Sequence, residues 1–456
     1  MKTDHAGHAV SGATQAGLEA YEQAAHEFRC MIADPVATID RAIEACPAMP
    51  MAYVLKGWLM LLGTEPEGLP VARDCARRAE PMQATDRERA HVEAVRAAAH
   101  GHWREAGRRL EDVAARWPHD ALALQAGHQI DFLCGDARML RDRIARAIGA
   151  WSESMPAYHA LLGMYAFGLE ETGDYERAER FGRRAVELQP RDGWAWHAVA
   201  HVHEMRNRPS DGIAWLAPNA ATWSHDSFLA VHNWWHLALF HLERDDVDEV
   251  LRLYDGPIFG SRSAVVFDLL DATAMLWRLT LRGVDVGDRW EAVAQRWLPI
   301  AQVNDYAFND VHAAMSFVCT GRNAECEHVV ARQRGVLRQA EEAAGDNAFF
   351  LREVGHDATR AIAAFGDGRY AECVRLLRRI RNHAHRFGGS HAQRDVLDLT
   401  LIEAAIRSGD RALAQALAAE RAALRPHSPP TRRLVQRAGA IRPALGETER
   451  LESAAA

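Results

Sequence analysis

A unit of two helices, repeated along the chain, is the feature of this sequence that most restricts its fold. The clearest copy is HALLGMYAFGLEETGDYERAERFGRRAVELQPRD, residues 159–192. Apolar residues recur at helical spacing on both sides of a turn at Gly173, and the second segment ends at Pro190. The pattern predicts two antiparallel helices that cross at small side chains such as Ala166 and Ala178.

Further copies of this unit occur on both sides of the clearest one. Residues 88–120 carry small residues and a terminal proline at the same positions, and glycine-led turns at Gly135, Gly321 and Gly368 indicate others. We therefore predict an all-α fold, an α-solenoid of about ten helix pairs that resemble tetratricopeptide repeats. These pairs are expected to form a right-handed superhelix with a concave groove.

One solenoid domain is expected to include most of the chain. It would span residues 17–425, after a flexible N-terminus (1–16) and before a loosely ordered tail (426–456) that contains RPHSPP and ESAAA. The length of 456 residues alone would suggest two or three domains. A repeat array escapes that estimate because it grows by stacking units.

Composition restricts the partners and the compartment. The net charge of -8 disfavours nucleic acid and anionic membranes as partners. The seven cysteines are scattered without a C-x-x-C pair, which indicates neither a disulfide framework nor a cysteine zinc site and favours a cytoplasmic location. The sequence contains neither a signal peptide nor an apolar run long enough to span a membrane, so no membrane association is expected.

Histidines are concentrated near the centre of the chain, where seven of the 23 lie in residues 197–241. In the first helix of such a repeat, positions of about 2, 5, 9 and 12 face the concave side. With Gly193 as position 1, the inward positions hold His197, His201 and Glu204. By the same register Trp196 is a packing residue, and His203 is expected to lie between helices.

A second histidine pair lies in HNWWHLALFHLE, which begins at His232. Aligning Trp235 with Trp196 directs this pair into the same groove. Two imidazoles at i and i+4 can share a divalent metal, and Zn, Fe, Mn and Ni all suit such ligands. A divalent metal is thus the one cofactor that the pattern suggests. The other interpretation is a set of groove or core histidines that hydrogen-bond to neighbours. The candidate metal ligands are His197, His201, His232 and His236.

Other candidate site residues surround these histidines in the predicted register. The candidates for acid–base chemistry are Glu204, His201 and Asp310. Tryptophans of this region can line a pocket or pack between helices, and Arg394 can reach a ligand or cap a helix at the surface. The candidates for ligand binding are Trp194, Trp234, His312 and Arg394.

Five strings of the sequence resemble the tetratricopeptide repeat protein thirty-eight family, over about residues 20–423. They are YAFGLEETGDYERAE, HAVAHVHEM, HNWWHLALFHLE, FNDVHAAM and GGSHAQRDV, in this order. The resemblance implies an all-helical repeat protein and no general activity. The histidine strings look like family signatures. The residues carried over from the resemblance as site candidates are His197, His201, Glu204, His232, His236, Asp310 and His312.

Two functions stay open at the level of sequence. The chain is a binding protein that holds a small molecule or a peptide in a groove lined by His, Glu and Trp, or it is an enzyme that acts there on a small molecule. In the second case a metal-dependent hydrolase or lyase fits the clustered histidines. The chain carries no phosphate-binding glycine loop, nucleophile elbow or dinucleotide fingerprint. Homo-oligomerisation is left open as well.

Overall fold

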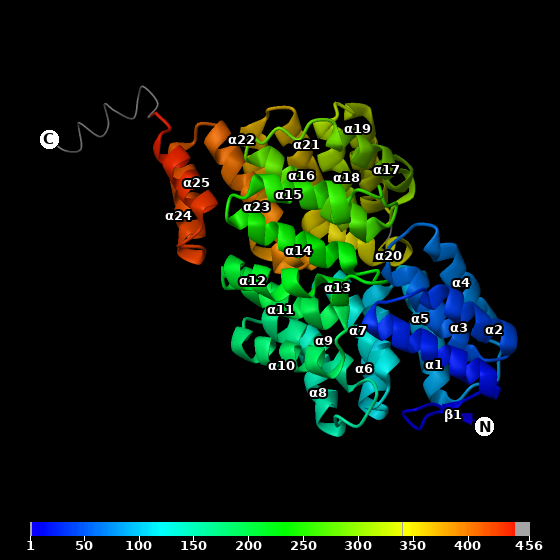
Figure 1. The fold of residues 1–456 in the computed structure, drawn as a ribbon. Helices are drawn as coiled ribbons and strands as arrows, with labels where there is room; N and C mark the ends of the chain where they lie inside the picture. Colours follow the sequence, from blue (N-terminus) through cyan, green and yellow to red (C-terminus); the bar gives the residue numbers. More distant parts are fainter. Residues whose placement is uncertain (1, 340, 443–456) are drawn as a thin grey trace.

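The computed structural model describes residues 2–339 and 341–442, and this part of the chain is almost entirely helical. Two short strands, β1 (Lys2–Thr3) and β2 (Ala9–Val10), form an antiparallel hairpin at the N-terminus. The helices follow one another as pairs joined by short turns (Figure 1). The predicted fold class, an all-α solenoid of tetratricopeptide-like pairs, is confirmed.

The first half of the array contains six helix pairs and a short connection. The pairs and the elements that follow them are α1 (Gln15–Cys30) and α2 (Pro35–Ala45), α3 (Pro50–Leu62) and α4 (Gly68–Ala79), α5 (Asp86–Ala99) and α6 (Trp103–Arg116), α7 (Ala121–Leu133) and α8 (Ala137–Ala147) with η1 (Ile148–Ala150), α9 (Tyr158–Glu171) and α10 (Tyr175–Leu188), α11 (Gly193–Met205) and α12 (Pro209–Leu216) with η2 (Ala217–Asn219) and α13 (Ala220–Trp223).

The second half is less regular, because π-helical and 3-10 turns interrupt it. Its elements are α14 (Ala230–Glu243), α15 (Val247–Leu253), η3 (Tyr254–Ile258), α16 (Val266–Leu281), α17 (Arg289–Val303), α18 (Ala307–Cys319), α19 (Asn323–Leu337), α20 (Glu341–Phe350), η4 (Leu351–Gly355), α21 (His356–Gly366), α22 (Tyr370–Ile380), η5 (Arg381–Phe387), α23 (His391–Arg407), α24 (Arg411–Leu424) and α25 (Pro429–Gly439).

The pair α9–α10 shows how local sequence produces the repeat. Gly173 adopts φ +85° in the turn, a conformation that side chains with a Cβ rarely take. Asp174 then caps α10, and its carboxylate accepts a hydrogen bond from the backbone N–H of Arg177. At Gly168 a Cβ would lie 2.5 Å from the backbone of Leu140, so the glycine permits α9 to approach α8 closely. The predicted helical pair within residues 159–192 is confirmed.

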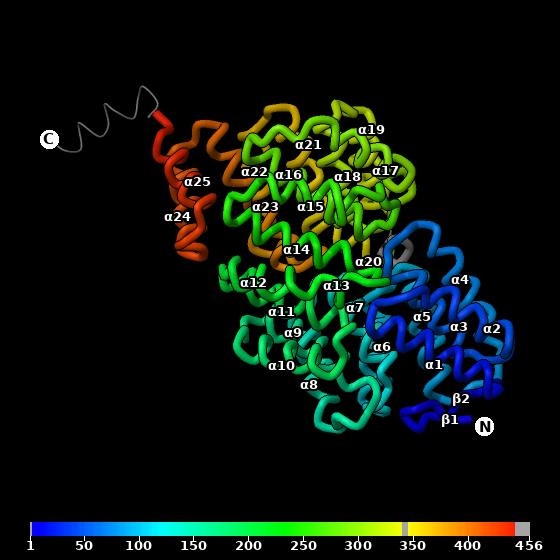
Figure 2. The backbone as a smooth tube through the Cα atoms, in the orientation of Figure 1, coloured from blue at the N-terminus to red at the C-terminus, as the bar shows by residue number. Residues whose placement is uncertain are grey.

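Successive first helices stack on one another, and the array curls until its two halves touch. In sequence order α9 contacts α11, α11 contacts α14, and α14 contacts α16. The halves meet where Tyr306 donates a hydrogen bond to the carbonyl of Leu133 (2.9 Å) and where the N–H of Asp346 donates to the carbonyl of Gly101 (2.8 Å). Figure 2 shows α20 beside the N-terminal helices.

The inner face beside α11 differs from the open groove that the repeat register suggests. The late helix α23 contacts both α11 and α16 there. Arg278 of α16 donates to the carbonyl of Ala392 at 2.6 Å, and Trp277 donates to Thr400 at 2.9 Å. Because the solenoid curls back on itself, a helix from its own C-terminal part covers this stretch of the concave side.

Both terminal segments contain regular structure. In the segment expected to be flexible, Ser11 donates from its backbone N–H and its hydroxyl to the buried carboxylate of Glu88 (2.8 and 2.7 Å). In the segment expected to be loosely ordered, α25 packs against α24, while residues 443–456 lie outside the described part. The division of the chain into one solenoid and two ends stays a prediction. No helix of the described residues is both long and apolar enough to cross a bilayer.

Candidate metal centre

Four histidines from two adjacent helices meet inside the molecule. His197 and His201 lie one turn apart on α11, and His232 and His236 lie one turn apart on α14, which packs against α11. One nitrogen from each ring lies within 4.8 Å of one nitrogen from every other ring. The structure therefore brings together all four residues that were predicted from the sequence as metal ligands. We call these four residues the histidine cluster.

The rings of the cluster are close enough to share one ion. The centroids of His197 and His201 are 4.4 Å apart, and those of His201 and His236 are 4.5 Å apart. The Nε2 atoms of His197 and His232 are separated by 3.1 Å. Nitrogens bound to a common zinc at about 2.0–2.1 Å lie roughly 3 Å from each other, so this separation fits two ligands of the same ion.

Burial leaves most nitrogens of the cluster without protein partners. Among the described residues, both ring nitrogens of His201 and of His236, and Nδ1 of His197, accept or donate no hydrogen bond. Burial lowers the pKa of His201 to about 3 and holds the pKa values of His197 and His236 well below the usual range. These imidazoles are therefore neutral and have lone pairs available for a metal.

Two carboxyl groups lie directly behind the cluster. Asp271 of α16 is buried and hydrogen-bonds Nδ1 of His232 at 2.8 Å, which leaves Nε2 of that ring directed at His197. The carboxyl of Glu170 at the end of α9 is fully buried, and its Oε2 lies 3.5 Å from Nδ1 of His201. Burial and the neighbouring Glu171 hold the pKa of Glu170 well above its usual range. Carboxylates in this position orient metal-bound imidazoles and offset the charge of the ion.

A cavity of about 390 Å³ reaches the cluster through His197 and His232. Its wall is largely apolar, and Trp194 forms part of it next to His197, with ring centroids 4.7 Å apart. Polar groups are few, and two of them are the carboxyls of Asp268 and Glu65. Burial raises the pKa of Asp268 to about 6 and also raises that of Glu65. The apolar wall contains Phe28, Met31, Pro35, Val36, Leu59, Leu62, Phe132, Leu133, Phe228, Leu229, Val265 and Phe267.

The remaining predicted acid–base residues have partners elsewhere. Glu204 faces inward as its register requires, but its carboxylate accepts a hydrogen bond from Arg425 at 2.8 Å. Asp310 is fully buried in a different network, where it accepts hydrogen bonds from Asn304 and Gln333 (2.8 and 2.9 Å) and pairs with Arg332. The prediction that Asp310 joins the histidines is wrong, because α18 directs this carboxylate towards α19.

The predicted binding residues divide into two groups. Trp194 lines the cavity. The guanidinium of Arg394 lies 3.4 Å from the carboxylate of Glu171, the neighbour of Glu170 in sequence, and also donates to the carbonyl of Gly389. The cavity wall does not include His312 or Trp234. Nδ1 of His312 hydrogen-bonds the carbonyl of Phe308, and the ring of Trp234 packs edge-on against Trp223 with ring centroids 4.7 Å apart. The structure thus places both side chains outside this cavity, and their binding role stays a prediction. Burial lowers the pKa of His312 to about 4, as expected for a core histidine.

Sequence reasoning missed several residues of this site. Glu170 occupies the same register position in α9 that Glu204 occupies in α11, so the repeat itself pointed to it. Asp271 and Asp268 lie on the next first helix, α16, whose sequence has no histidine to attract attention. His128 of α7 packs edge-on against Trp194 at 5.9 Å, and no register argument identifies it.

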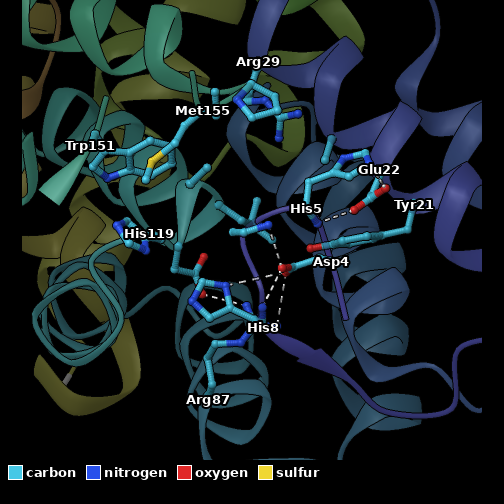
Figure 3. Close-up of a pocket in the computed structure, with 17 residues that line it drawn as sticks. Asp4, His5, His8, Tyr21, Glu22, Arg29, Arg87, His119, Trp151 and Met155 are labelled. Atoms are coloured by element: carbon cyan, nitrogen blue, oxygen red, sulfur yellow. Dashed lines mark hydrogen bonds and ion pairs between the residues drawn. The ribbon is translucent and has the colours of Figure 1, made fainter. Parts of the chain in front are cut away.

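A separate pocket of about 150 Å³ lies at the N-terminal hairpin (Figure 3). Its charged groups are mostly satisfied within the protein. His5 pairs with Glu22 at 3.0 Å, and the carboxylate of Asp4 accepts the backbone N–H of His8 at 2.8 Å. Arg87 pairs with Asp120 at 2.8 Å. Among its lining residues the buried atom without a partner is Nε of Arg29, which is a hydrogen-bond donor and cannot bind a metal ion.

No protein-family model matches the chain. Similar solved structures include the human IFIT1 dimer with m7Gppp-AAAA, at 11% identity over 94% of this chain and 95% of that chain with a TM-score of 0.42. Another is Cut9 of the APC/C hetero-tetramer Cut9–Hcn1, at 12% identity over 92% of this chain and 76% of that chain, with a TM-score of 0.39. Yeast Tom70 is similar at 12% identity over 93% of this chain and 95% of that chain, with a TM-score of 0.32. At these identities and scores the likenesses carry no inference about ligand or partner.

Proposed function

We propose that this protein binds a divalent transition metal through the histidine cluster and a small, mainly apolar molecule in the adjoining cavity. The observation that carries the proposal is the convergence of four imidazoles whose nitrogens are buried and largely unpartnered. Buried polar atoms without partners cost about 1–3 kcal/mol each, so several in one place favour a compensating ligand. A single metal ion would bind one nitrogen of each ring, and so would satisfy one unpartnered nitrogen of His201 and one of His236 at once.

The surroundings of the cluster support a metal over a purely structural role. His203, also on α11 and buried, has no hydrogen-bond partner among the described residues either, but it lies near Glu179 and Arg183 of α10 and not among other histidines. At the cluster, Asp271 orients one ligand and Glu170 lies beside another. All-imidazole ligand sets suit Zn, Cu, Ni and Fe, and the donor types do not choose among these metals.

The cavity indicates the class of molecule that binds beside the metal. Its volume of about 390 Å³ and its apolar wall suit a compact hydrophobic ligand. His197, His232 and Asp268 all line it, so the ligand would present one polar group towards these side chains. A long peptide is disfavoured, because α23 covers the inner face that an extended chain would follow.

Elemental analysis of wild-type protein and of the His197→Ala/His236→Ala variant tests the proposal. The variant should lose about one metal ion per chain, because two of the four ligands are gone. His203→Ala is the matched control: it should lose stability and keep the metal, whereas His201→Ala should lose the metal. Wild-type protein that neither contains nor takes up metal in the absence of chelators would contradict the proposal, as would a metal content that is unchanged in the double variant.

Catalysis on the bound molecule is the second candidate, and Asp268 favours it. When bound, a metal of this kind supplies a polarising positive charge and a water of lowered pKa. Asp268 lines the same cavity, and its pKa near 6 suits transfer of a proton at neutral pH. Glu204 cannot take this role because Arg425 holds its carboxylate. If activated esters are hydrolysed, Asp268→Asn should abolish turnover with unchanged metal content; undiminished turnover in this variant would exclude the role.

Membership of the tetratricopeptide repeat protein thirty-eight family is part of the proposal. Its support is the set of five strings, two of which contribute all four cluster histidines. If the proposal is correct, a structure of another member should place the corresponding histidines in one cluster.

The proposed cytoplasmic location rests on the cysteine pattern, and the proposed exclusion of nucleic acid as a partner rests on the net charge of -8. Light scattering tests whether the protein self-associates. Titrations with RNA test whether it binds nucleic acid.

A further inference from the structure

A second group of metal-binding side chains lies where α1 meets α9, apart from the histidine cluster. His26 and Cys30 occupy positions i and i+4 of α1, and His159 lies at the start of α9. One ligand atom from each residue lies within 4.8 Å of the other two. The Cys30 Sγ atom is 3.9 Å from either ring nitrogen of His26. We call this group the Cys30 cluster.

His159 is oriented as a metal ligand would be. Its Nδ1 hydrogen-bonds the Oδ2 atom of Asp192 at 2.7 Å, so a lone pair remains on Nε2. The residue is only 5% exposed, and Nε2 has no hydrogen-bond partner among the described residues. Cys30 is fully buried. The Cys30 cluster therefore contains an unsatisfied imidazole nitrogen beside a buried sulfur.

A comparable histidine–aspartate pair earlier in the chain shows what is special here. In the pair formed by His91 and Asp120, the carboxylate also binds Arg87 at 2.8 Å, so its charge is neutralised within the protein. Asp192 accepts hydrogen bonds from His159 and from the backbone N–H of Ala195, and no Lys or Arg of the described residues is within ion-pair distance of it. Its negative charge is thus available to balance a cation bound on the other side of the imidazole.

We propose that His26, Cys30 and His159 bind a zinc ion. A Cys thiolate and two imidazoles are preferred zinc ligands, and three protein ligands leave a fourth position for water or another donor. The thiol proton is released on binding, and the thiolate together with Asp192 then balances the 2+ charge. The scattered cysteines suggested no such site, because Cys30 finds its partners one turn away and on a distant helix.

The position of this site gives it a role at the cavity. Met31, the residue after Cys30, lines the cavity, and its carbonyl accepts a hydrogen bond from Ser227 at 3.0 Å. Asp192 caps α11, the helix that carries His197 and His201. A zinc ion would therefore join the end of α1 to α9 and to the start of α11, and would hold one wall of the cavity in place.

Cobalt(II) added to the metal-free full-length protein provides the test. A thiolate bound to Co²⁺ produces a charge-transfer band in the near ultraviolet, and the all-imidazole cluster cannot produce one. Wild-type protein should show the band, and Cys30→Ser should lose it. Cys373→Ala, a change at another fully buried cysteine, should keep it. Absence of the band in wild-type protein, or its persistence in Cys30→Ser, overturns the proposal.

Two more variants separate this site from the proposed function and from misfolding. The His197→Ala/His236→Ala variant should keep the cobalt–thiolate band, so failure of one site leaves the other testable. If Cys30→Ser does not fold, His26→Ala serves instead, because His26 is only partly buried and its loss should weaken cobalt binding about ten-fold or more. An unchanged band and affinity in a folded His26→Ala protein would also overturn the proposed ligand set.

Discussion

The surroundings of Asp310 and the histidine cluster are both deeply buried and polar, but they differ in how their polar atoms are satisfied. Each oxygen of Asp310 accepts at least one hydrogen bond, and Arg332 balances its charge. In the histidine cluster only the contacts among His197, His232 and Asp271 satisfy ring nitrogens. The first arrangement is complete within the protein, whereas in the second several ring nitrogens of the described residues have no protein partner.

Under the proposed function, this difference separates residues that stabilise the fold from residues that bind a ligand. Both sets lie on first helices of the repeat, and both consist of residue types found in active sites. Register and residue type therefore do not distinguish them. The number of polar atoms that remain without a protein partner does, because burial makes each such atom costly.

The largest expected effect on stability is at Asp310. Asp310→Ala leaves Arg332 without its carboxylate in a buried setting and should lower the free energy of unfolding by about 3–5 kcal/mol. Urea denaturation measures the loss. Asp310→Asn, which keeps hydrogen-bonding capacity, should lose less. A folded Asp310→Ala protein with normal stability but without metal would reverse the roles assigned to the two regions.

Metal binding at the cluster should produce the next largest effect. In a Cys30→Ala background, which removes the second site, free metal at about one hundred times its dissociation constant should stabilise the protein by about 3 kcal/mol. Thermal denaturation with and without metal measures this gain. Adding His197→Ala and His236→Ala should remove the response. An equal response in that protein would place the metal elsewhere.

A smaller effect is expected at Asp268, whose carboxyl faces the cavity. Its pKa near 6 is raised above the usual value near 4, so ionisation destabilises the folded state. Relative to Asp268→Asn, wild-type protein should lose about 3 kcal/mol as the pH rises from about 4 through 6, and nothing further above about 7. Melting temperatures of both proteins across this range provide the check. A difference that does not depend on pH would show that the carboxyl is already satisfied.

The smallest expected effect compares two glutamates at the same register position. Glu170→Gln removes an unpartnered carboxyl beside His201 and should weaken metal binding about ten-fold without destabilising the metal-free protein. Glu204→Gln removes the partner of Arg425 and should lower stability while metal affinity is maintained. Metal titrations and denaturation curves distinguish them. Equal effects of the two substitutions on affinity would remove the distinction between these carboxyls.

The repeat register correctly predicted that the four histidines share a face of their helices, but it did not predict the position of Asp310. One physical reason explains both results. Positions i and i+4 of a helix lie on one face whatever the tertiary structure, so His197 with His201 and His232 with His236 were predictable. The distance between two helices far apart in sequence depends on how the superhelix curves. Asp310 was assigned by register to the same groove, but the turn of α18 directs it to Arg332 and Gln333 of α19.

The sequence by itself determined the helix pairs, their stacking order and the side of α11 and α14 on which the histidines lie, because these follow from local periodicity. Only the tertiary structure decided that α23 covers the inner face, that Glu204 pairs with Arg425, and that Cys30 meets His159. These contacts join residues more than a hundred positions apart. They depend on the accumulated curvature of many repeats, which no single repeat encodes.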